Sequence, residues 1–266
     1  MIPYFSIAIL LFVMLFSFLG SFLYTASPYD LHVDAILASP STQFLLGTDR
    51  LGRDILARLI EGGKVSLIIG IASAFIATFI GLIIGATAGF LRGKVDKTFV
   101  VVVDLFLTFP TFFLLLALVS YVNASVLVLI VIISVTGWMT TARLIRSESF
   151  AITSQPYIKI LRIAGVSKIK ILLKYYAPLL APIYFVSFTF GVGGAILAES
   201  SLSFLGLGVV APQMSWGTII SNGKEVIEIA WWVSFFPGLM IFLITFSLIN
   251  ISNYLQQLTN KKEIRN

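Results

Sequence analysis

Residues 105–142 read LFLTFPTFFLLLALVSYVNASVLVLIVIISVTGWMTTA and carry no charged side chain. A helix needs about 20 consecutive apolar residues to cross the hydrocarbon core of a bilayer. This run is long enough for most of two membrane-spanning helices, with a turn expected near residues 121–125. Because the apolar residues are continuous and do not alternate with polar ones, the pattern argues against a transmembrane barrel. The predicted fold class is an all-α membrane protein.

Other uncharged runs complete the set of predicted spans. Hydrophobic residues make up 58% of the 266 residues and charged residues only 11%, whereas a soluble domain carries about 25% charged residues. We expect six transmembrane helices, of which the third begins near Phe99 and includes Asp104, and the fourth follows the turn. The other four are predicted over residues 5–24, 65–91, 175–198 and 229–251.

The spans divide the chain into three predicted parts. Residues 1–64 form an N-terminal transmembrane helix and an external elbow segment. Residues 65–256 form the core transmembrane domain, with a long loop at 143–178, and residues 257–266 form a short cytoplasmic tail. The first apolar run lacks a preceding basic segment, so we interpret it as an uncleaved signal-anchor.

The basic residues predict the orientation of the chain. With six spans, both termini lie on one side of the membrane, and 13 of the 18 Lys and Arg residues fall on that side. Loops rich in Lys and Arg stay in the cytoplasm. We therefore expect a multi-pass protein of the cell inner membrane with both termini cytoplasmic. The net charge of +6 reflects this topology and attraction to the lipid surface, not nucleic-acid binding.

The residue inventory excludes several kinds of site. The chain has no cysteine and one histidine, His32, so disulfides and thiolate metal sites are excluded, and no metal site is predicted. A membrane-embedded hydrolase needs a nucleophile with a His, Lys or carboxylate partner inside the spans, and no catalytic residue is predicted. The sequence contains no G-x-x-x-x-G-K-[ST] motif, so this chain does not bind ATP through a P-loop.

The cytoplasmic stretch SQPYIKILRIAGVSKIKILLKYYAPLLAP, residues 154–182, combines apolar residues with basic residues and no acid. Ser154 or Gln155 is expected to cap a helix over residues 157–164, and Gly165 ends it in the left-handed conformation.

A second helix is expected directly after this turn. Ser167 caps it, and it covers residues 168–177. Pro178 stops or kinks it, because proline removes a backbone donor and clashes with the preceding turn.

The first of these helices carries one apolar stripe, formed by Tyr157, Ile160, Leu161 and Ala164 at spacings of three and four residues. Arg162 lies off this stripe. A helix of about nine residues is marginal alone in water, so we expect the stripe to dock on another surface. That surface is either a groove in a cytoplasmic partner protein or, with the cationic face down, anionic lipid.

Within this stretch, YIKILRIAGVSKIKILLKYYAPLLAP resembles the EAA loop of binding-protein-dependent ABC importer permeases. The motif's usual Ala-Ala pair is replaced here by Ile160–Leu161, and its usual histidine by Tyr175. In that family a short coupling helix sits in a groove of the ATP-hydrolysing subunit. The resemblance implies that the ATPase-coupling residues are Tyr157, Ile160, Leu161, Arg162, Ala164, Gly165, Ser167 and Pro178.

Other stretches resemble the dipeptide, oligopeptide and nickel branch of this family. They are LLGTDRLGRDILARLIEGGKVSL from Leu45, GATAGFLRGKVDKTFVVVVDLFLTFP from Gly85 and AESSLSFLGLGVVAPQMSWGTII from Ala198. The resemblance covers most of the chain from Leu45 onward. Two departures are Val101, where the family has an arginine, and NISNYLQQLTNKK near the end, where Gly-Asp and Asp-Pro pairs are expected.

The resemblance implies a type I ABC importer permease fold and a set of partners. The chain would form half of a translocation pathway, in a heterodimer with a homologous permease subunit in the lipid bilayer. Two ATPase subunits would hold ATP and Mg, with no cofactor on this chain, and an extracytoplasmic substrate-binding protein would deliver short peptides. Nickel or a metal chelate is the alternative substrate. A stand-alone secondary carrier is the alternative of another class, although it would need several buried charges.

The motif GTDRLGRD begins at Gly47 and precedes the second span. Gly47 and Gly52 permit tight turns, and Asp49, Arg53 and Asp54 are able to pair locally. One reading is a cluster of surface ion pairs, each worth about 0–1 kcal/mol. The reading that we favour is a rigid external elbow that leads into the span.

Five residues inside the spans are candidates for the pathway or its gating. Asp104 either lines the path or holds a helix pair together, since a charge within a span faces a bundle interior or water. Pro110 is expected to kink the third helix. Gly191, Gly193 and Gly194 either pack helices together or give the fifth span a flexible point. A separate repeat of glycines at every fourth position predicts close helix packing in the second span; it comprises Gly81, Gly85 and Gly89.

Overall fold

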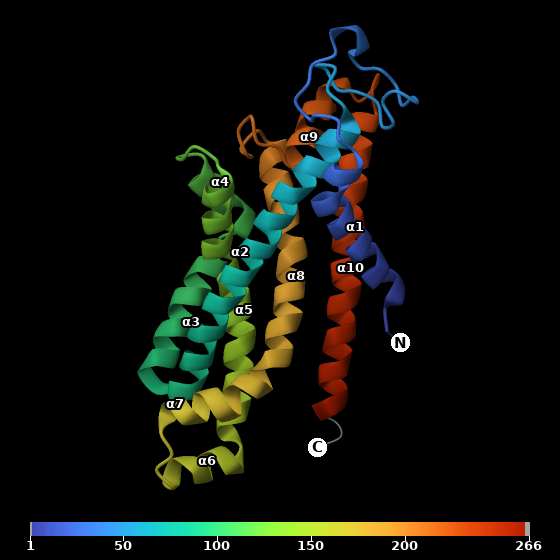
Figure 1. The fold of residues 1–266 in the computed structure, drawn as a ribbon. Helices are drawn as coiled ribbons and strands as arrows, with labels where there is room; N and C mark the ends of the chain where they lie inside the picture. Colours follow the sequence, from blue (N-terminus) through green and yellow to red (C-terminus); the bar gives the residue numbers. More distant parts are fainter. Residues whose placement is uncertain (1, 264–266) are drawn as a thin grey trace.

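Long apolar helices dominate the computed structural model, which describes residues 2–263. Within those residues, five helical runs are long and apolar enough to cross a membrane. They are α1 (Tyr4–Leu23), α2 (Ile55–Leu91), α5 (Val126–Ser154), the run from α7 to α8 (Lys168–Phe204) and α10 (Trp232–Glu263). These helices lie roughly side by side (Figure 1).

The third predicted span is broken into two helices. α3 (Gly93–Leu107) and α4 (Thr111–Val119) meet at an angle of 77°. Pro110 precedes α4 with an extended ψ of 122°, and a proline disfavours helical conformation in the residue before it. The predicted kink is therefore a sharp break. When this pair counts as one span, the described residues contain the six predicted spans.

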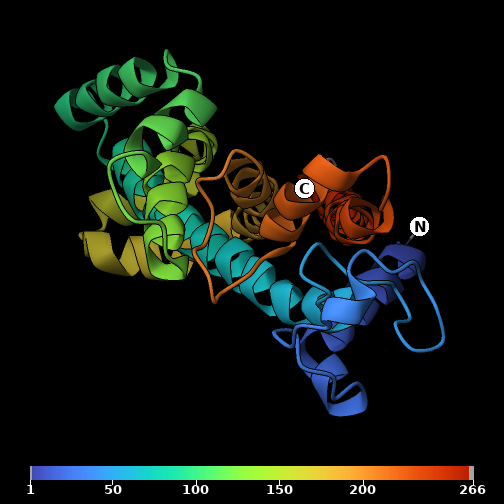
Figure 2. The ribbon, with the colours of Figure 1, turned by 90° about the horizontal axis from the view of Figure 1, so that it is seen from above.

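Short elements occupy the two ends of the bundle. α6 (Pro156–Ile163), α7 (Lys168–Ile171) and the π-helical turn η2 (Leu172–Tyr176) lie at one end, here called the α6 end (Figure 1). The opposite end, here called the α9 end, holds residues 24–54, α9 (Trp216–Gly223) and two 3-10 turns, η1 (Val33–Ala35) and η3 (Lys224–Val226). Seen from above, residues 24–54 lie on the side of α1 and α10, away from α3 and α4 (Figure 2).

The centre of the bundle is α2, which packs on α5 and α8. Its glycine repeat makes the contact with α5 close. A Cβ added to Gly81 would lie 2.9 Å from the carbonyl oxygen of Trp138, and one added to Gly89 would lie 2.7 Å from that of Arg146. The prediction of close packing through small residues is confirmed.

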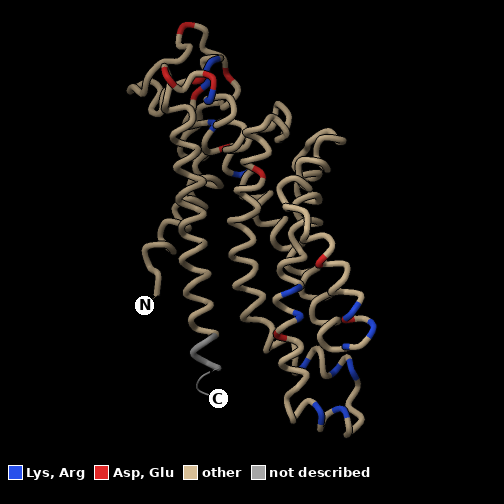
Figure 3. The backbone as a smooth tube through the Cα atoms, turned by 180° about the vertical axis from the view of Figure 1, so that it is seen from behind, with Lys and Arg blue, Asp and Glu red and all other residues tan. Residues whose placement is uncertain are grey.

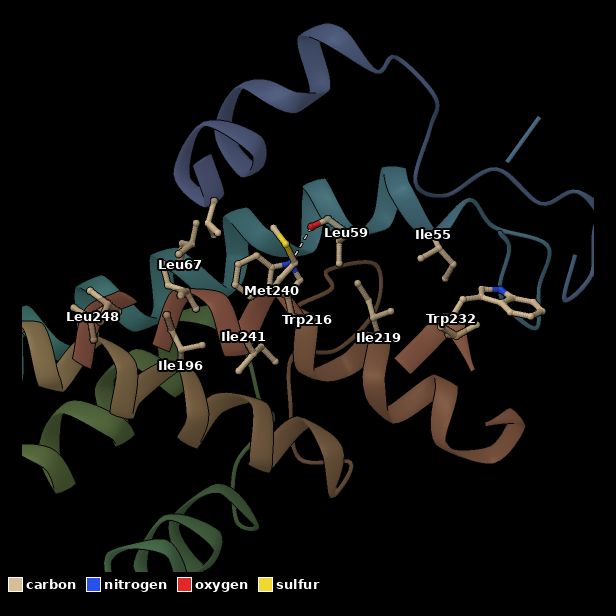
Figure 4. Packing of buried hydrophobic residues seen from close by; sticks show 14 of the residues in the cluster. Ile55, Leu59, Leu67, Ile196, Trp216, Ile219, Trp232, Met240, Ile241 and Leu248 are labelled. Atoms are coloured by element: carbon tan, nitrogen blue, oxygen red, sulfur yellow. Dashed lines mark hydrogen bonds between the residues drawn. The ribbon is translucent and has the colours of Figure 1, made fainter. Parts of the chain in front are cut away.

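The largest apolar core lies toward the α9 end, where α1, α2, α8, α9 and α10 meet (Figure 4). Trp216 is fully buried there, and its indole N–H donates to the carbonyl oxygen of Leu59 at 2.9 Å. Ile55, Leu67 and Ile196 are fully buried in the same cluster. The hydrogen bond satisfies the one polar group of the indole, which fixes α9 against α2.

Two predicted helix ends differ in the structure. α8 (Ala177–Phe204) continues past residue 198 and takes Glu199 into the helix. Of the two predicted effects of Pro178, it does not stop the second helix of the 154–182 stretch, because it occupies the first turn of α8; the turn of the chain just before it fits the predicted kink. α7, η2 and α8 therefore form one helical run, which turns near η2 (Figure 1).

Charged residues separate between the two ends. Lys and Arg gather around α3, α6 and α7, and most of the Asp and Glu lie toward the α9 end (Figure 3). The α6 end is therefore the end that the rule for basic residues assigns to the cytoplasm.

Candidate functional site

The turn between α6 and α7 has the geometry that its sequence predicts. Gly165 has φ of +75°. Its N–H bonds to the carbonyl oxygen of Arg162 at 3.1 Å, and the N–H of Val166 bonds to that of Leu161 at 3.1 Å. This pair of bonds is a Schellman motif, which satisfies the last carbonyl groups of α6. Ser167 then caps α7, because its hydroxyl accepts from the backbone N–H of Lys170.

The apolar residues of α6 divide between two surfaces. Ile158 is fully buried against the bundle, although the predicted stripe did not include it. Within that stripe Leu161 is partly buried, whereas Tyr157, Ile160 and Ala164 are exposed. Ile158 therefore attaches α6 to the chain's own core and leaves most of the predicted stripe uncovered.

Other large apolar side chains at the α6 end are also exposed. Ile160 is 63% exposed, Ile163 87%, and Ile169 and Leu173 each 70%. Together with Tyr157 we call these five residues the exposed apolar group. Contiguous exposed apolar surface marks a site for a protein or membrane partner.

Arg162 connects α6 to the end of α2. Its guanidinium donates to the carbonyl oxygen of Phe90 at 3.2 Å and lies 4.5 Å from the centre of the Phe90 ring. The edge of Tyr176 meets the same ring, with 5.2 Å between the ring centres. Tyr176 is also hydrogen-bonded to Thr153 of α5. We call these contacts the Arg162 link; through them α6 and η2 contact α2 and α5.

Asp104 lies in an ion pair between two helices. Its carboxylate is 2.5 Å from the guanidinium of Arg143 on α5. Two turns earlier on α3, Asp96 contacts Arg146 at 2.5 Å. Residues eight apart on a helix share a face, so the two pairs tie one face of α3 to α5. Of the two predicted roles of Asp104, these contacts favour the holding of a helix pair.

Two of the three candidate glycines of α8 border a small, partly open cavity, whereas Gly193 faces Thr245 and Leu248 of α10. This cavity of about 190 Å³ is lined by residues of α2, α4, α5 and α8, among them Gly191 and Gly194. A Cβ on Gly191 would lie 3.3 Å from that of Ala74, whereas nothing lies within 4 Å of a Cβ on Gly194. Asp104 and Pro110 do not line this cavity. The structure therefore does not gather the five pathway candidates in one place.

The elbow is a folded turn and not a set of loose surface pairs. Gly47 and Gly52 have φ of +78° and +71°. A Cβ on Gly47 would lie 2.6 Å from the indole nitrogen of Trp232. Asp49, 2% exposed, accepts bonds from the backbone N–H groups of Leu51 and Arg53 at 2.9 and 3.0 Å. The buried carboxylate holds the turn closed.

Asp54 joins this turn to α2. Its carboxylate caps the helix by accepting from the N–H groups of Leu56 and Ala57 at 2.7 and 3.1 Å. The hydroxyl of Tyr24, directly after α1, donates to the same carboxylate. Burial and this bond raise the pKa of Tyr24 to about 12, so its phenol stays protonated at neutral pH and ties α1 to α2.

Glu199 is a buried polar centre that the sequence analysis did not single out. The side chain is fully buried and accepts from Ser203 at 2.6 Å and from Ser66 and Ser200 at 3.4 Å. Ser66 in turn accepts from the backbone N–H of Trp216 at 3.0 Å. The network joins α2, α8 and α9. The feature of the sequence that could have indicated this network is the run ESSLS, a glutamate with serines one, two and four residues later.

The α6 end also borders the largest cavity described. It measures about 1140 Å³ and is lined by parts of α5, α6, α8 and α10, including the coupling candidates Tyr157 and Pro178. Within residues 2–263, no three His, Asp or Glu side chains gather as metal ligands.

Comparison with known proteins gives a consistent result. Residues 77–262 match the family described as the binding-protein-dependent transport system inner membrane component. The oligopeptide transport system permease protein OppC of Haemophilus influenzae is 31% identical over 260 residues, which cover 97% of this chain and 84% of that protein. The nickel transport system permease protein NikC of Escherichia coli K12 is 33% identical over 219 residues, covering 81% of this chain and 79% of that protein.

A solved structure shares the fold. The inward-facing MetNI methionine ABC transporter contains a chain with a TM-score of 0.59 and 19% identity, over 74% of this chain and 96% of that one.

Proposed function

This chain belongs to the binding-protein-dependent transport system inner membrane components, and we propose that it forms half of the translocation pathway of an ATP-driven importer of short peptides. It is a multi-pass membrane protein and a permease subunit. The peptide preference is supported by its similarity to an oligopeptide permease over nearly the whole chain.

The observation that carries the proposal is the exposed apolar group at the α6 end. Ile160 and Ile163 are exposed on a helix that Ile158 and the Arg162 link attach to the bundle. An anchored helix with exposed apolar residues is typical of a helix that docks into a groove of a protein partner, and it is not expected of a loop without a binding role. We assign that groove to a separate ATPase subunit, which supplies the hydrolysis that this chain does not perform.

The proposed assembly has two membrane chains. This chain pairs with a homologous permease, and each carries one of two ATPase subunits that bind ATP and Mg. A substrate-binding protein delivers cargo at the α9 end, outside the cytoplasm, and both termini lie on the cytoplasmic side. In this assembly residues 1–64 form the anchor and elbow, 65–256 the core with its coupling loop at 143–178, and 257–266 the tail, of which 264–266 lie outside the described residues.

The proposed mechanism is rigid-body rocking of the spans. ATP binding closes the ATPase pair, and the movement enters this chain through α6. The Arg162 link passes it to α2 and α5, and the continuous run from α7 into α8 passes it to α8. The pathway then opens alternately toward the two sides of the membrane.

Nickel or a metal chelate is the second candidate substrate, since the nickel permease of Escherichia coli K12 is 33% identical. Soft or imidazole ligands along the path would favour a metal, but the sequence has no cysteine and one histidine, His32. The ligand inventory therefore favours peptides.

The deciding experiment is uptake in a strain from which this chain is deleted. Labelled dipeptide and nickel are offered side by side, with and without the restored gene. We expect restoration to return dipeptide uptake and leave nickel uptake unchanged. Loss of nickel uptake with dipeptide uptake intact would reverse the preference. ATP hydrolysis or ion-driven uptake by the purified chain alone would refute the permease assignment.

A further inference from the structure

A polar cavity of about 510 Å³ lies at the α9 end. Its walls are the elbow, the first turn of α2, and the segment between α8 and α9. Tyr29, Arg53, Arg58, Ser203 and Asn222 line it, together with residues 208–214. We call it the arginine cavity. Its volume falls within the range of about 300–1000 Å³ that is usual for small-molecule sites.

The charges that line the cavity are positive. Arg53 and Arg58 both contribute to its wall, and Asp49, which lies behind them, is the acid that contacts both. Glu199 is shielded behind Ser203, whose hydroxyl donates to it at 2.6 Å. The two charged side chains that line the cavity are therefore both guanidinium groups, with Asp49 and Asp54 as the buried acids of the adjoining elbow.

The closest ion-pair partner of the Asp49 carboxylate is Arg53. One of its oxygens accepts from two backbone N–H groups of the turn, and the other accepts from the Nε of Arg53 at 2.8 Å. The Nε of Arg58 lies farther away, at 3.4 Å, and forms no hydrogen bond within the described residues. Arg58 is 3% exposed, and the one hydrogen bond recorded for its guanidinium goes to the carbonyl oxygen of Pro28 at 3.2 Å.

A buried guanidinium with unused donors requires an acceptor, because buried polar groups are almost always hydrogen-bonded. Its planar fork fits the two oxygens of a carboxylate. Tyr29 and Asn222 also line the cavity, and a hydroxyl and an amide are both able to donate hydrogen bonds. The wall therefore matches a ligand that carries one carboxylate and a short chain behind it.

We propose that the arginine cavity binds the terminal carboxylate of a short peptide as it passes from the binding protein to the membrane pathway. The identity of the peptide rests on the proposed function, whereas the carboxylate preference rests on Arg53 and Arg58. The two arginines in the cavity wall also attract an anionic end before contact.

The test measures binding to the assembled transporter in lipid nanodiscs, without the binding protein. The probes are N-acetylalanine and its uncharged N-methylamide, each titrated by saturation-transfer NMR. We expect the acid to bind at least about tenfold more tightly than the amide, as the loss of a charge-assisted bidentate pair implies. Arg58→Gln should abolish this difference and Arg53→Gln should reduce it, because the unused donors belong to Arg58 whereas Arg53 is bonded to Asp49.

Arg50→Gln is the matched control. Arg50 lies three residues before Arg53, pairs with Glu225 and does not line the cavity, so its variant should keep the preference for the acid. Arg58→Lys retains the charge but loses the planar fork, and it should reduce the preference while the protein still folds. Equal binding of acid and amide to the wild type, or equal effects of Arg50→Gln and Arg53→Gln, would overturn the proposal.

Two further outcomes separate this site from the proposed function. Arg53-dependent binding of N-acetylalanine without any ATP-driven dipeptide uptake supports the site and refutes the peptide importer. Dipeptide uptake without a carboxylate preference supports the importer and refutes the site. A preference for the acid that arises only when the binding protein is present would assign the carboxylate site to that protein and would also refute the proposal.

Discussion

Gly165 adopts φ of +75° between α6 and α7, a conformation that β-branched residues avoid. A Cβ at this position would meet nothing within 4 Å, so a substitution acts through the backbone and not through a clash. Left-handed conformation costs an ordinary residue about 1–2 kcal/mol. We expect Gly165→Val to lower ATP-driven uptake several-fold while the protein still inserts, because it displaces α7 relative to α6.

Gly165→Asn is the matched control, since asparagine tolerates the left-handed region. It should retain most of the uptake. Uptake is measured in proteoliposomes, and insertion by the amount of protein in the membrane fraction. Equal uptake by Gly165→Val and the wild type would refute the coupling role of this turn.

Glu199 offers a test of the network at the α9 end. Glu199→Ala leaves the hydroxyls of Ser66, Ser200 and Ser203 without their acceptor in a buried site, and an unsatisfied buried group costs about 1–3 kcal/mol. We expect a lower melting temperature in detergent. Glu199→Gln retains an acceptor oxygen, so its melting temperature should fall less than that of Glu199→Ala.

Glu61→Ala is the control for the Glu199 variants. Glu61 lies on α2 in a partly exposed pair with Lys64, and such a pair contributes about 0–1 kcal/mol. A melting temperature of Glu199→Ala that matches that of Glu61→Ala would show that the buried network does not hold α9.

At the scale of elements, α6 shows where sequence periodicity stops being informative. Apolar residues occur on several sides of this helix, so the spacing of Tyr157, Ile160, Leu161 and Ala164 did not reveal that Ile158 is the buried anchor. The caps were predictable because Gly165 and Ser167 act through local backbone geometry. The Arg162 link was not, since Phe90 lies 72 residues earlier in the chain.

The predicted ends of spans failed for a related reason. A charged residue was taken to end the fifth span, but the serines around Glu199 let α8 continue to Phe204. The break at Pro110 was foreseen as a kink, and its size of 77° depends on how α3 and α4 pack on α5. Local chemistry determines where a helix begins or bends, and tertiary contacts determine the angle of the bend and the length of the helix.

The exposed apolar group predicts a contact that mutation should weaken. Ile160→Ser and Ile163→Ser remove apolar surface at the α6 end without touching the buried Ile158. Burial of an isoleucine side chain contributes about 1.5–3 kcal/mol, so each variant should reduce copurification of the ATPase subunit about tenfold or more.

Leu51→Ser is the control for this contact, because Leu51 is 52% exposed at the opposite end of the bundle. It should leave copurification unchanged. If all three variants retain the ATPase subunit equally, α6 lies on lipid and not in a protein groove.

For the whole molecule, the distribution of charge predicts orientation. The chain has no cysteine, so single cysteines introduced at Asp30 and Lys168 report on the two ends without background. In intact cells with a permeable outer layer, a membrane-impermeant maleimide should label Asp30→Cys and leave Lys168→Cys unlabelled until the membrane is opened. The reverse pattern would place the α6 end outside and contradict both the charge rule and the docking of an ATPase.

The helical run from Lys168 to Phe204 gives the molecule a lever. It has 37 residues, which at 1.5 Å per residue amount to a contour of about 55 Å. One arm ends among the exposed apolar side chains of α7, and the other ends at Ser203 in the wall of the arginine cavity. The fulcrum is the crossing with α2, where Gly70 faces Ile196. In the proposed cycle, a tilt imposed on the arm at the α6 end would move the wall of the arginine cavity in the opposite sense, so that capture and release of a carboxylate would follow the closing and opening of the ATPase pair.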